Sequence, residues 1–176
     1  MSQTTPLHGV HESLGATMVD FAGWLMPLRY GSESAEHRAV RAAAGLFDLS
    51  HMGEIFVTGR EAAAALDHAL VSRLSALKVR RARYTMLCAP DGGVLDDLIV
   101  YRLAEEEFLV VANAANADRV AAELAARAEG FDAAVTDRSA AYALLAVQGP
   151  RSAEILAAAG VGDADLGGLR YYGVQP

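Results

Sequence analysis

Two adjacent aspartates, Asp96 and Asp97, stand in the middle of an apolar segment, and they are the side chains of this sequence best suited to acid–base chemistry. Apolar residues flank the pair at 94–95 and 98–100, as in a β-strand, although strands disfavour aspartate. Because successive strand residues point to opposite faces, at least one carboxylate must face whichever side of the sheet is covered. A half-buried carboxylate needs hydrogen-bond partners or a chemical role. The alternative is that both acids end a hairpin turn and stay in water.

Other polar side chains offer weaker indications of a site. Tyr84 and Tyr101 could line one face of the same sheet with aromatic surface, although strand tyrosines are commonly ordinary packing residues. Asn113 ends an apolar strand, where its amide could bind a polar ligand or cap the helix that follows. Ser50 and His51 are sequence neighbours, which does not supply the geometry of a catalytic triad, so we do not expect hydrolase chemistry. The histidines have no partner cysteines and no HExxH pattern, so we expect no metal site.

Hydrophobic periodicity predicts the elements that must position these side chains. Between Met52 and Arg138 the expected order is β-α-β-β-β-α-β, with strands at 53–59, 81–89, 94–103, 107–111 and 131–136 and helices at 60–70 and 114–128. Residues 90–93, Pro-Asp-Gly-Gly, predict a hairpin turn, since proline presets φ and glycine accepts positive φ. Two helices against one mostly antiparallel sheet imply an α+β sandwich of the split-βαβ, ferredoxin-like type with an additional strand.

Outside that unit the pattern is sparser. It predicts a helix over 33–44, an apolar strand over 141–147 and another helix over 151–159. The strand either begins a different unit or returns to the one that contains residues 1–50.

Composition limits the classes of partner. The chain has 176 residues, enough for one or two domains, and its 53% hydrophobic and 21% charged residues are typical of folded globular proteins. A net charge of -7 leaves no basic surplus, so we expect neither nucleic acid nor a membrane as a partner. The single cysteine cannot form an internal disulfide. No apolar run approaches the ~20 residues that cross a bilayer and no basic-then-apolar leader is present, which favours a cytoplasmic location.

Read as whole phrases, the sequence resembles the glycine cleavage T-protein family along its entire length. The phrases are TPLH at 5–8, GATMVDFAGWLMPL at 15–28, EHRAVR at 36–41, GLFDLSHM at 45–52, GGVLDDLIVY at 92–101, VVAN at 110–113 and VQGP at 147–150. Any one of them could arise by chance, but all of them in this order would not.

The resemblance implies an aminomethyltransferase of the glycine cleavage system. Such an enzyme transfers the one-carbon unit from the aminomethyl-dihydrolipoyl arm of the H-protein to tetrahydrofolate, with release of ammonia, and gives 5,10-methylenetetrahydrofolate. By the family's pattern Asp97 is the catalytic carboxylate near the folate nitrogens, and Asp96 is structural. A fixed carboxylate can orient the pterin amine and offset charge on an iminium-like carbon. The positions that line the folate pocket in the family are Met52, Tyr84, Asp97, Tyr101, Asn113 and Tyr171.

The resemblance also implies a domain plan. The family has three domains around a central folate channel, and the middle one is ferredoxin-like. Residues 1–51 and 139–176 would then form a first domain that is incomplete at its C-terminal side, and residues 52–138 the second. The third domain and its folate contacts are absent from this chain, so we expect the 176 residues alone to be inactive. Alternatives are a related folate-binding protein, such as a demethylating oxidase or an iron–sulfur assembly factor, or an inactive binding module.

Overall fold

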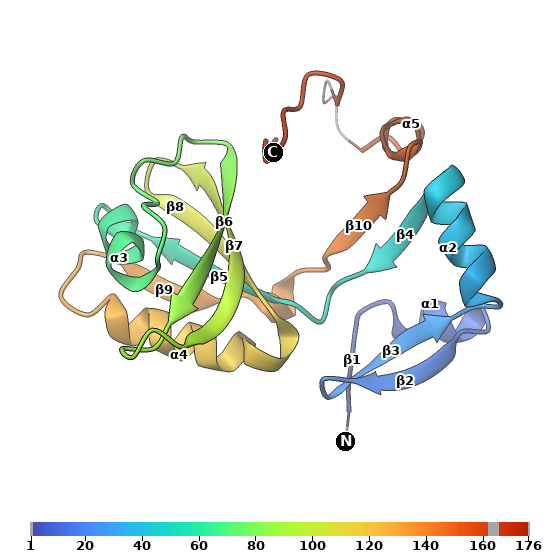
Figure 1. Ribbon diagram of the computed structural model, residues 1–176, viewed down its shortest axis with the longest axis horizontal. Helices are drawn as coiled ribbons and strands as arrows, with labels where there is room; N and C mark the ends of the chain where they lie inside the picture. Colours follow the sequence, from blue (N-terminus) through green and yellow to red (C-terminus); the bar gives the residue numbers. More distant parts are fainter. Residues whose placement is uncertain (1, 162–165, 176) are drawn as a thin grey trace. The chain divides into compact units, whose positions relative to one another are not determined.

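The computed structural model describes residues 2–161 and 166–175, and their contacts divide the chain into two compact units (Figure 1). Unit 1 takes the described residues of 1–51 and 143–168, and unit 2 takes those of 52–142 and 169–176. Both units contain helices and strands, so the chain is an α+β protein. Within the described residues no helix is long and apolar enough to span a membrane.

Unit 2 is built on a five-stranded sheet with the strand order β6-β7-β8-β5-β9. Its strands are β5 (Gly53–Thr58), β6 (Arg81–Cys88), β7 (Val94–Ala104), β8 (Glu107–Ala112) and β9 (Ala134–Asp137). All adjacent pairs are antiparallel. The predicted hairpin is confirmed, because β6 pairs with β7 across the turn at 90–93.

One of the two expected split-βαβ connections is present in this sheet. Strands β8 and β9 both run antiparallel to β5 between them, so they are parallel to each other, and the helix α4 (Ala117–Arg127) connects them. The helix α3 (Ala62–Ala69) connects strands β5 and β6 along the chain. Two other strands lie between β5 and β6 in the antiparallel sheet, so β5 and β6 run in opposite directions. Because of the additional strand, the two strands that α3 connects are antiparallel, whereas a second split-βαβ connection would join parallel strands.

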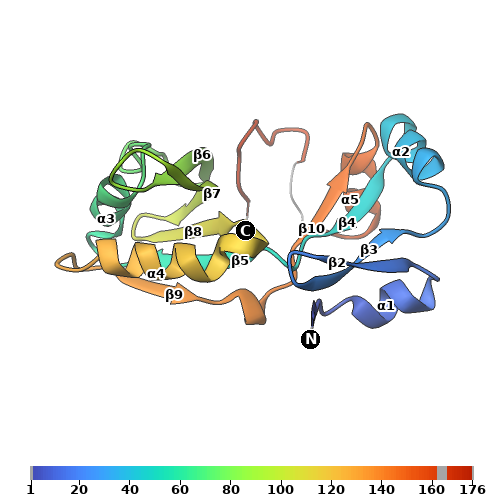
Figure 2. The same ribbon diagram turned by 60° about the horizontal axis from the view of Figure 1, so that its bottom comes forward.

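Helices α3 and α4 pack on one face of the sheet (Figure 2). In α3 the buried residues Ala62, Ala65, Leu66 and Ala69 follow the helical spacing of an amphipathic helix. Gly53 permits the close approach of α4, since a Cβ there would lie 2.8 Å from the Cβ of Ala117. The buried core between helices and sheet includes Ile55, Val57, Leu66, Leu87, Leu98, Val100, Phe108, Val110, Val120 and Leu124.

Strand alternation sends a second set of side chains to the opposite face, because residues paired across antiparallel strands share a face. The register pairs Met86 with Asp97, Tyr84 with Ile99, and Ala82 with Tyr101. It also pairs Ile99 with Val111 and Tyr101 with Leu109. The side of the sheet that carries Tyr84, Met86, Asp97, Ile99, Tyr101, Leu109 and Val111 is called the Asp97 face below. Glu54 and Phe56 of β5 share it by register.

Unit 1 contains two small sheets. Strands β1 (Gln3–Thr4), β3 (Trp24–Arg29) and β2 (Thr17–Phe21) form one in that order, and β4 (Gly45–Asp48) pairs with β10 (Leu145–Gln148) in the other. The helices are α1 (His8–Ser13), α2 (Glu33–Ala42) and α5 (Ser152–Ala158). A buried contact joins α1 to β4, where His11 Nε2 lies 2.9 Å from Asp48 Oδ2. The apolar strand after residue 140 thus returns to the unit that holds residues 1–50, one of the two alternatives left open by the sequence.

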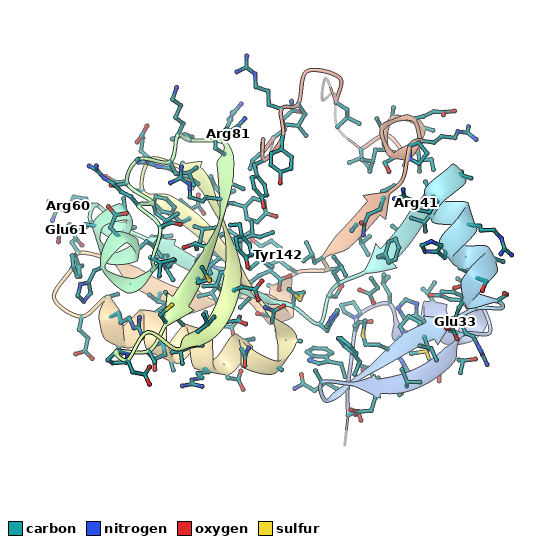
Figure 3. All side chains as sticks on the ribbon, in the orientation of Figure 1. Glu33, Arg41, Arg60, Glu61, Arg81 and Tyr142 are labelled. Atoms are coloured by element: carbon teal, nitrogen blue, oxygen red, sulfur yellow. The ribbon has the colours of Figure 1, made fainter. Side chains whose placement is uncertain are left out.

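The boundaries of the compact units differ from the expected domain boundaries at two places, because residues 139–142 and 169–175 pack with unit 2. The later segment is tied to the edge of β6, where the Ala82 amide donates to the Tyr172 carbonyl at 2.8 Å. The earlier one begins as a short 3-10 helix, η2 (Ser139–Ala141), in place of the expected start of a strand. Its Ser139 hydroxyl accepts from the Glu54 amide at 2.9 Å, and the Tyr142 ring stacks on Phe56 (Figure 3).

Candidate functional site

The two adjacent aspartates point to opposite faces of the sheet of unit 2. Asp96 pairs with Leu87 and lies on the helix-covered face, where it is 4% exposed. Asp97 pairs with Met86 on the Asp97 face and is exposed. The alternative in which both acids remain in water is therefore wrong, because one of them is buried.

The buried Asp96 carboxylate accepts three hydrogen bonds. Its Oδ2 accepts from the Asn113 amide nitrogen at 3.1 Å, and its Oδ1 accepts from Asn113 Nδ2 at 2.9 Å and Asn116 Nδ2 at 2.7 Å. These bonds join the middle of β7 to the end of β8 and to the 3-10 turn η1 (Ala114–Asn116) that precedes α4. Asn116 was missed from the sequence, although its spacing of one turn from Asn113 was a usable signal. Asp96 is thus a buried acid that accepts three hydrogen bonds.

The exposed Asp97 carboxylate is held from both sides. Its Oδ1 accepts from Asn113 Nδ2 at 3.0 Å, and its Oδ2 accepts from the Tyr84 hydroxyl at 3.1 Å. The hydrogen bond to Asp97 raises the pKa of Tyr84, so the phenol remains a donor at neutral pH. Asn113 contacts both acids and therefore links the buried carboxylate to the exposed one. The geometry presents an oriented acceptor to any ligand on this face, which is what general base or electrostatic catalysis requires.

The remaining predicted site residues lie on or beside this face. Tyr101 is half-buried on the Asp97 face, and burial raises its pKa. Met52 directly precedes β5, and because Gly53 pairs with Ala112, Met52 stands at the same end of its strand as Asn113 does on β8. No contact joins Met52 directly to Asp97 among the interactions of the described residues.

Tyr171 is not brought onto Asp97 itself. Its side chain is 81% exposed, and its ring centroid lies 4.4 Å from that of Tyr172. The pKa of Tyr172 is raised, first by a hydrogen bond with Tyr171 and to a smaller degree by the nearby Tyr101 and Tyr84. Tyr172 is tied to β6 through the hydrogen bond from the Ala82 amide to its carbonyl, and the sequence analysis missed it.

Glu54 is a second carboxyl group that the sequence analysis missed. It is 3% exposed, and neither carboxylate oxygen has a hydrogen-bond partner within the described part of the chain. Burial, with the nearby Asp137 as the smaller cause, raises the pKa of Glu54 to about 7. As with the aspartate pair, the signal in the sequence was an acidic residue inside a largely apolar strand segment, which for Glu54 is 53–59.

We expect Glu54 to make stability depend on pH. Its folded-state pKa of about 7 lies above the ordinary value of 4.5, so the folded chain holds this proton more tightly than the unfolded chain does. The stabilising contribution is present below pH 4.5 and is lost as pH rises through 7. Urea unfolding of the Glu54→Gln variant should lack a fall of about 1 to 3 kcal/mol that the parent shows between roughly pH 5 and pH 8.

The exposed Glu106, on the turn between β7 and β8, supplies the control for that experiment. Glu106→Gln should keep the pH dependence of the parent chain. An identical slope of unfolding free energy against pH in parent and Glu54→Gln would show that Glu54 is ionised normally.

The Ser50–His51 pair makes no catalytic contact. The Ser50 hydroxyl accepts from the Leu144 amide at 3.1 Å, and the His51 ring packs edge-on against Phe21 with centroids 5.5 Å apart. Over residues 2–161 and 166–175 there is no cluster of three histidine, cysteine or acidic side chains that could hold a metal ion.

Comparisons with known proteins point to one family. The family model described as the GCVT N-terminal domain matches residues 7–176. An aminomethyltransferase of Streptomyces avermitilis is 62% identical over 180 residues, which cover 100% of this chain and 48% of the relative. One of Thermus thermophilus is 51% identical, with 98% of this chain and 49% of the relative covered.

A solved structure agrees with these relatives. The crystal structure of glycine cleavage system aminomethyltransferase T from Bartonella henselae matches with a TM-score of 0.93 and 44% identity, over 98% of this chain and 47% of that chain. The chain therefore spans about half the length of the relatives that it matches.

Proposed function

Because this chain belongs to the family of the GCVT N-terminal domain, we propose that it acts in an aminomethyltransferase of the glycine cleavage system. The enzyme takes the one-carbon unit from the aminomethyl-dihydrolipoyl arm of the H-protein and transfers it to tetrahydrofolate. The C–N and C–S bonds of the aminomethyl carbon break, so ammonia and the dihydrolipoyl H-protein leave, and the carbon bonds to two folate nitrogens in the product 5,10-methylenetetrahydrofolate. The family membership confirms the resemblance drawn from the sequence phrases.

The observation that carries this proposal is the exposed Asp97 carboxylate, oriented by Tyr84 and Asn113 on a face with aromatic and aliphatic neighbours. In the proposed reaction a folate amine attacks the aminomethyl carbon, and Asp97 accepts a hydrogen bond from that amine. Its negative charge offsets the positive charge that develops on the iminium-like carbon. Two existing hydrogen bonds hold the carboxylate, so little reorganisation is needed when charge appears.

The other residues of the Asp97 face supply the wall of the folate site. Tyr101 and Tyr84 offer aromatic surface beside the carboxylate, and Asn113 offers a fixed amide. Met52 and Tyr171 complete the wall at its margins. Tetrahydrofolate is the acceptor substrate, and the mechanism needs no metal at this site.

The domain plan follows from the same proposal. Unit 2 corresponds to the ferredoxin-like middle domain, and unit 1 to a first domain that is incomplete at its C-terminal side. The remaining folate contacts come from the half of the relatives that this chain does not span. The 176 residues alone should therefore be inactive. We place the enzyme in the cytoplasm with the lipoylated H-protein as its partner, without nucleic acid or membrane.

The test uses the protein extended to the full length of its relatives. Ammonia release should require both tetrahydrofolate and H-protein that carries the aminomethyl arm, and the 176-residue chain should show none. Ammonia release that proceeds equally well without tetrahydrofolate would contradict the proposal. Oxidation of a methylated amine, measured in parallel, would instead favour a demethylating oxidase of the same superfamily.

A further inference from the structure

The two asparagines of the chain, Asn113 and Asn116, both stand where a helix begins. Asn113 is the N-cap residue of η1, and Asn116 is the N-cap residue of α4. Asparagine is favoured at this position because its side-chain oxygen can accept a hydrogen bond from an amide of the first turn. Neither side chain makes that bond, and both donate to Asp96 instead. Helix capping therefore does not account for either side chain.

The Asn113 side chain is shared between the two acids. Its Nδ2 carries two hydrogens and has three acceptors, which are Asp96 Oδ1 at 2.9 Å, Asp97 Oδ1 at 3.0 Å and the Asp97 carbonyl at 3.1 Å. The reverse orientation of the amide would set its oxygen against both carboxylates, so the acids fix which end faces Asp97. The hold of Asn113 on Asp97 therefore depends on how strongly Asp96 draws the same amide group.

Asn116 supplies the Asp96 oxygen that Asn113 also serves. Its Nδ2 donates to Asp96 Oδ1 at 2.7 Å, the shortest of the three hydrogen bonds that this carboxylate accepts. Asp96 is 4% exposed, so water does not freely replace a lost donor there. Without Asn116 the carboxylate would depend on Asn113 alone. The donor from Asn116 thus limits the demand that Asp96 makes on Asn113.

We propose that Asn116 is a positioning residue for the Asp97 carboxylate. It satisfies Asp96 Oδ1, so that the Asn113 amide group keeps its hydrogen bond to Asp97 Oδ1. The inference rests on the proposed function, in which Asp97 is the catalytic carboxylate. Asn116 acts through Asp96 and Asn113 and does not itself meet the ligand. The series of hydrogen bonds begins at the first turn of α4, on the covered side of the sheet, and ends on the Asp97 face.

Replacing Asn116 with alanine tests the series in the protein extended to the full length of its relatives. The kcat for ammonia release should fall about three- to tenfold, the rate equivalent of one neutral hydrogen bond. The KM for tetrahydrofolate should stay within about twofold of the parental value, because the lost bond lies behind the carboxylate and not on the ligand.

Asp118→Ala is the matched control. Asp118 is exposed in the first turn of α4, where its charge favours the start of the helix. Its loss should lower the midpoint of urea unfolding and leave kcat at the parental value. The comparison separates a weaker start of α4 from the loss of a donor to Asp96.

Asn116→Asp gives a readout that a purely structural role would not change. Aspartate caps a helix as well as asparagine does, so the start of α4 is preserved. Among the described residues Asp96 is the ionisable group bonded to Asn116, and the introduced carboxyl can donate to it only while the two acids share a proton. The ratio of variant to parental kcat should therefore rise as pH is lowered from about 9 to about 5.5. This variant also keeps the test available if Asn116→Ala does not fold.

A second readout does not depend on turnover. In the 176-residue chain labelled with ¹⁵N-asparagine, only Asn113 and Asn116 give side-chain amide signals, so the Asn116→Ala variant retains those of Asn113 alone. The two Asn113 amide protons should shift in opposite directions relative to the parent, because the bond to Asp96 strengthens while the bond to Asp97 weakens. Asp118→Ala should leave both signals in place.

Three outcomes would overturn the inference. They are a parental kcat in Asn116→Ala, a ratio of Asn116→Asp to parental kcat that is constant with pH, and unchanged Asn113 signals in Asn116→Ala. A parent that releases no ammonia, together with the expected shifts of the Asn113 signals, would instead contradict the proposed function on which the inference rests.

Discussion

Replacing Asp97 with asparagine should lower the turnover of the enzyme at the full length of its relatives by roughly a hundred- to ten-thousand-fold. The amide keeps the shape of the carboxylate, but it carries no charge to offset the cationic carbon. It also presents an amino group toward the Tyr84 hydroxyl or Asn113 Nδ2, both of which donate to Asp97 in the parent. Steady-state release of ammonia from aminomethyl-loaded H-protein measures the effect.

Asp91 supplies the control for this experiment. It lies exposed on the turn of the same hairpin, and its Oδ1 accepts from the Gly93 amide at 3.0 Å, a bond that an asparagine can also make. Asp91→Asn should turn over at the parental rate. Because Asp97 is exposed, its asparagine variant should also unfold within about 0.5 kcal/mol of the parent. Parental turnover in Asp97→Asn would move the catalytic role to another residue.

Replacing Asp96 with alanine should instead destabilise the fold, by about 2 to 5 kcal/mol. The substitution removes an acceptor for three donors, namely the Asn113 amide nitrogen, Asn113 Nδ2 and Asn116 Nδ2. In a site where the acid is 4% exposed, those donors cannot all be satisfied by water. Urea unfolding of the 176-residue chain, followed by circular dichroism, measures the loss as a shift of the midpoint.

Asp97→Ala in the same chain is the matched control, because the two acids are neighbours with the same side chain and differ only in face. It should unfold near the parental midpoint. Equal midpoints for Asp96→Ala and Asp97→Ala would show that the buried network contributes little to stability. Two adjacent aspartates are thus expected to give opposite results, one in stability and the other in turnover.

Loss of Asp96 should also disturb the position of the Asp97 carboxylate through Asn113. Asn113 Nδ2 bridges the two acids, at 2.9 Å to Asp96 Oδ1 and 3.0 Å to Asp97 Oδ1. Asp96 therefore holds the Asn113 side chain that also donates to Asp97. This arrangement gives a physical reason for an acidic pair in which only one member is available for chemistry.

Local patterns of residue types predicted most of the helices and strands of unit 2. Alternation and the turn at 90–93 predicted the strands that became β6 and β7, and the helical spacing of alanine and leucine predicted α3. The order of the phrases predicted the family, which the comparisons confirmed. In the first fifty residues the pattern predicted only the helix over 33–44, which corresponds to α2. The strands of the sheet β1-β3-β2 and the strand β4 were not expected; β1 has only two residues, and β4 pairs with β10 about a hundred residues later, whereas β2 and β3 are sequence neighbours whose hairpin was missed.

The sequence by itself determined that the two aspartates face opposite ways, because side chains alternate along any strand. Only the tertiary structure decided which acid is buried, since that depends on where α3 and α4 pack. The same holds for the bond of Asn116 to Asp96, for the Glu54 carboxyl group, which has no hydrogen-bond partner among the described residues, and for the attachment of Tyr172 to β6. Each depends on contacts between residues distant in sequence, and a local pattern of residue types carries no information about the partner that the folded chain brings near.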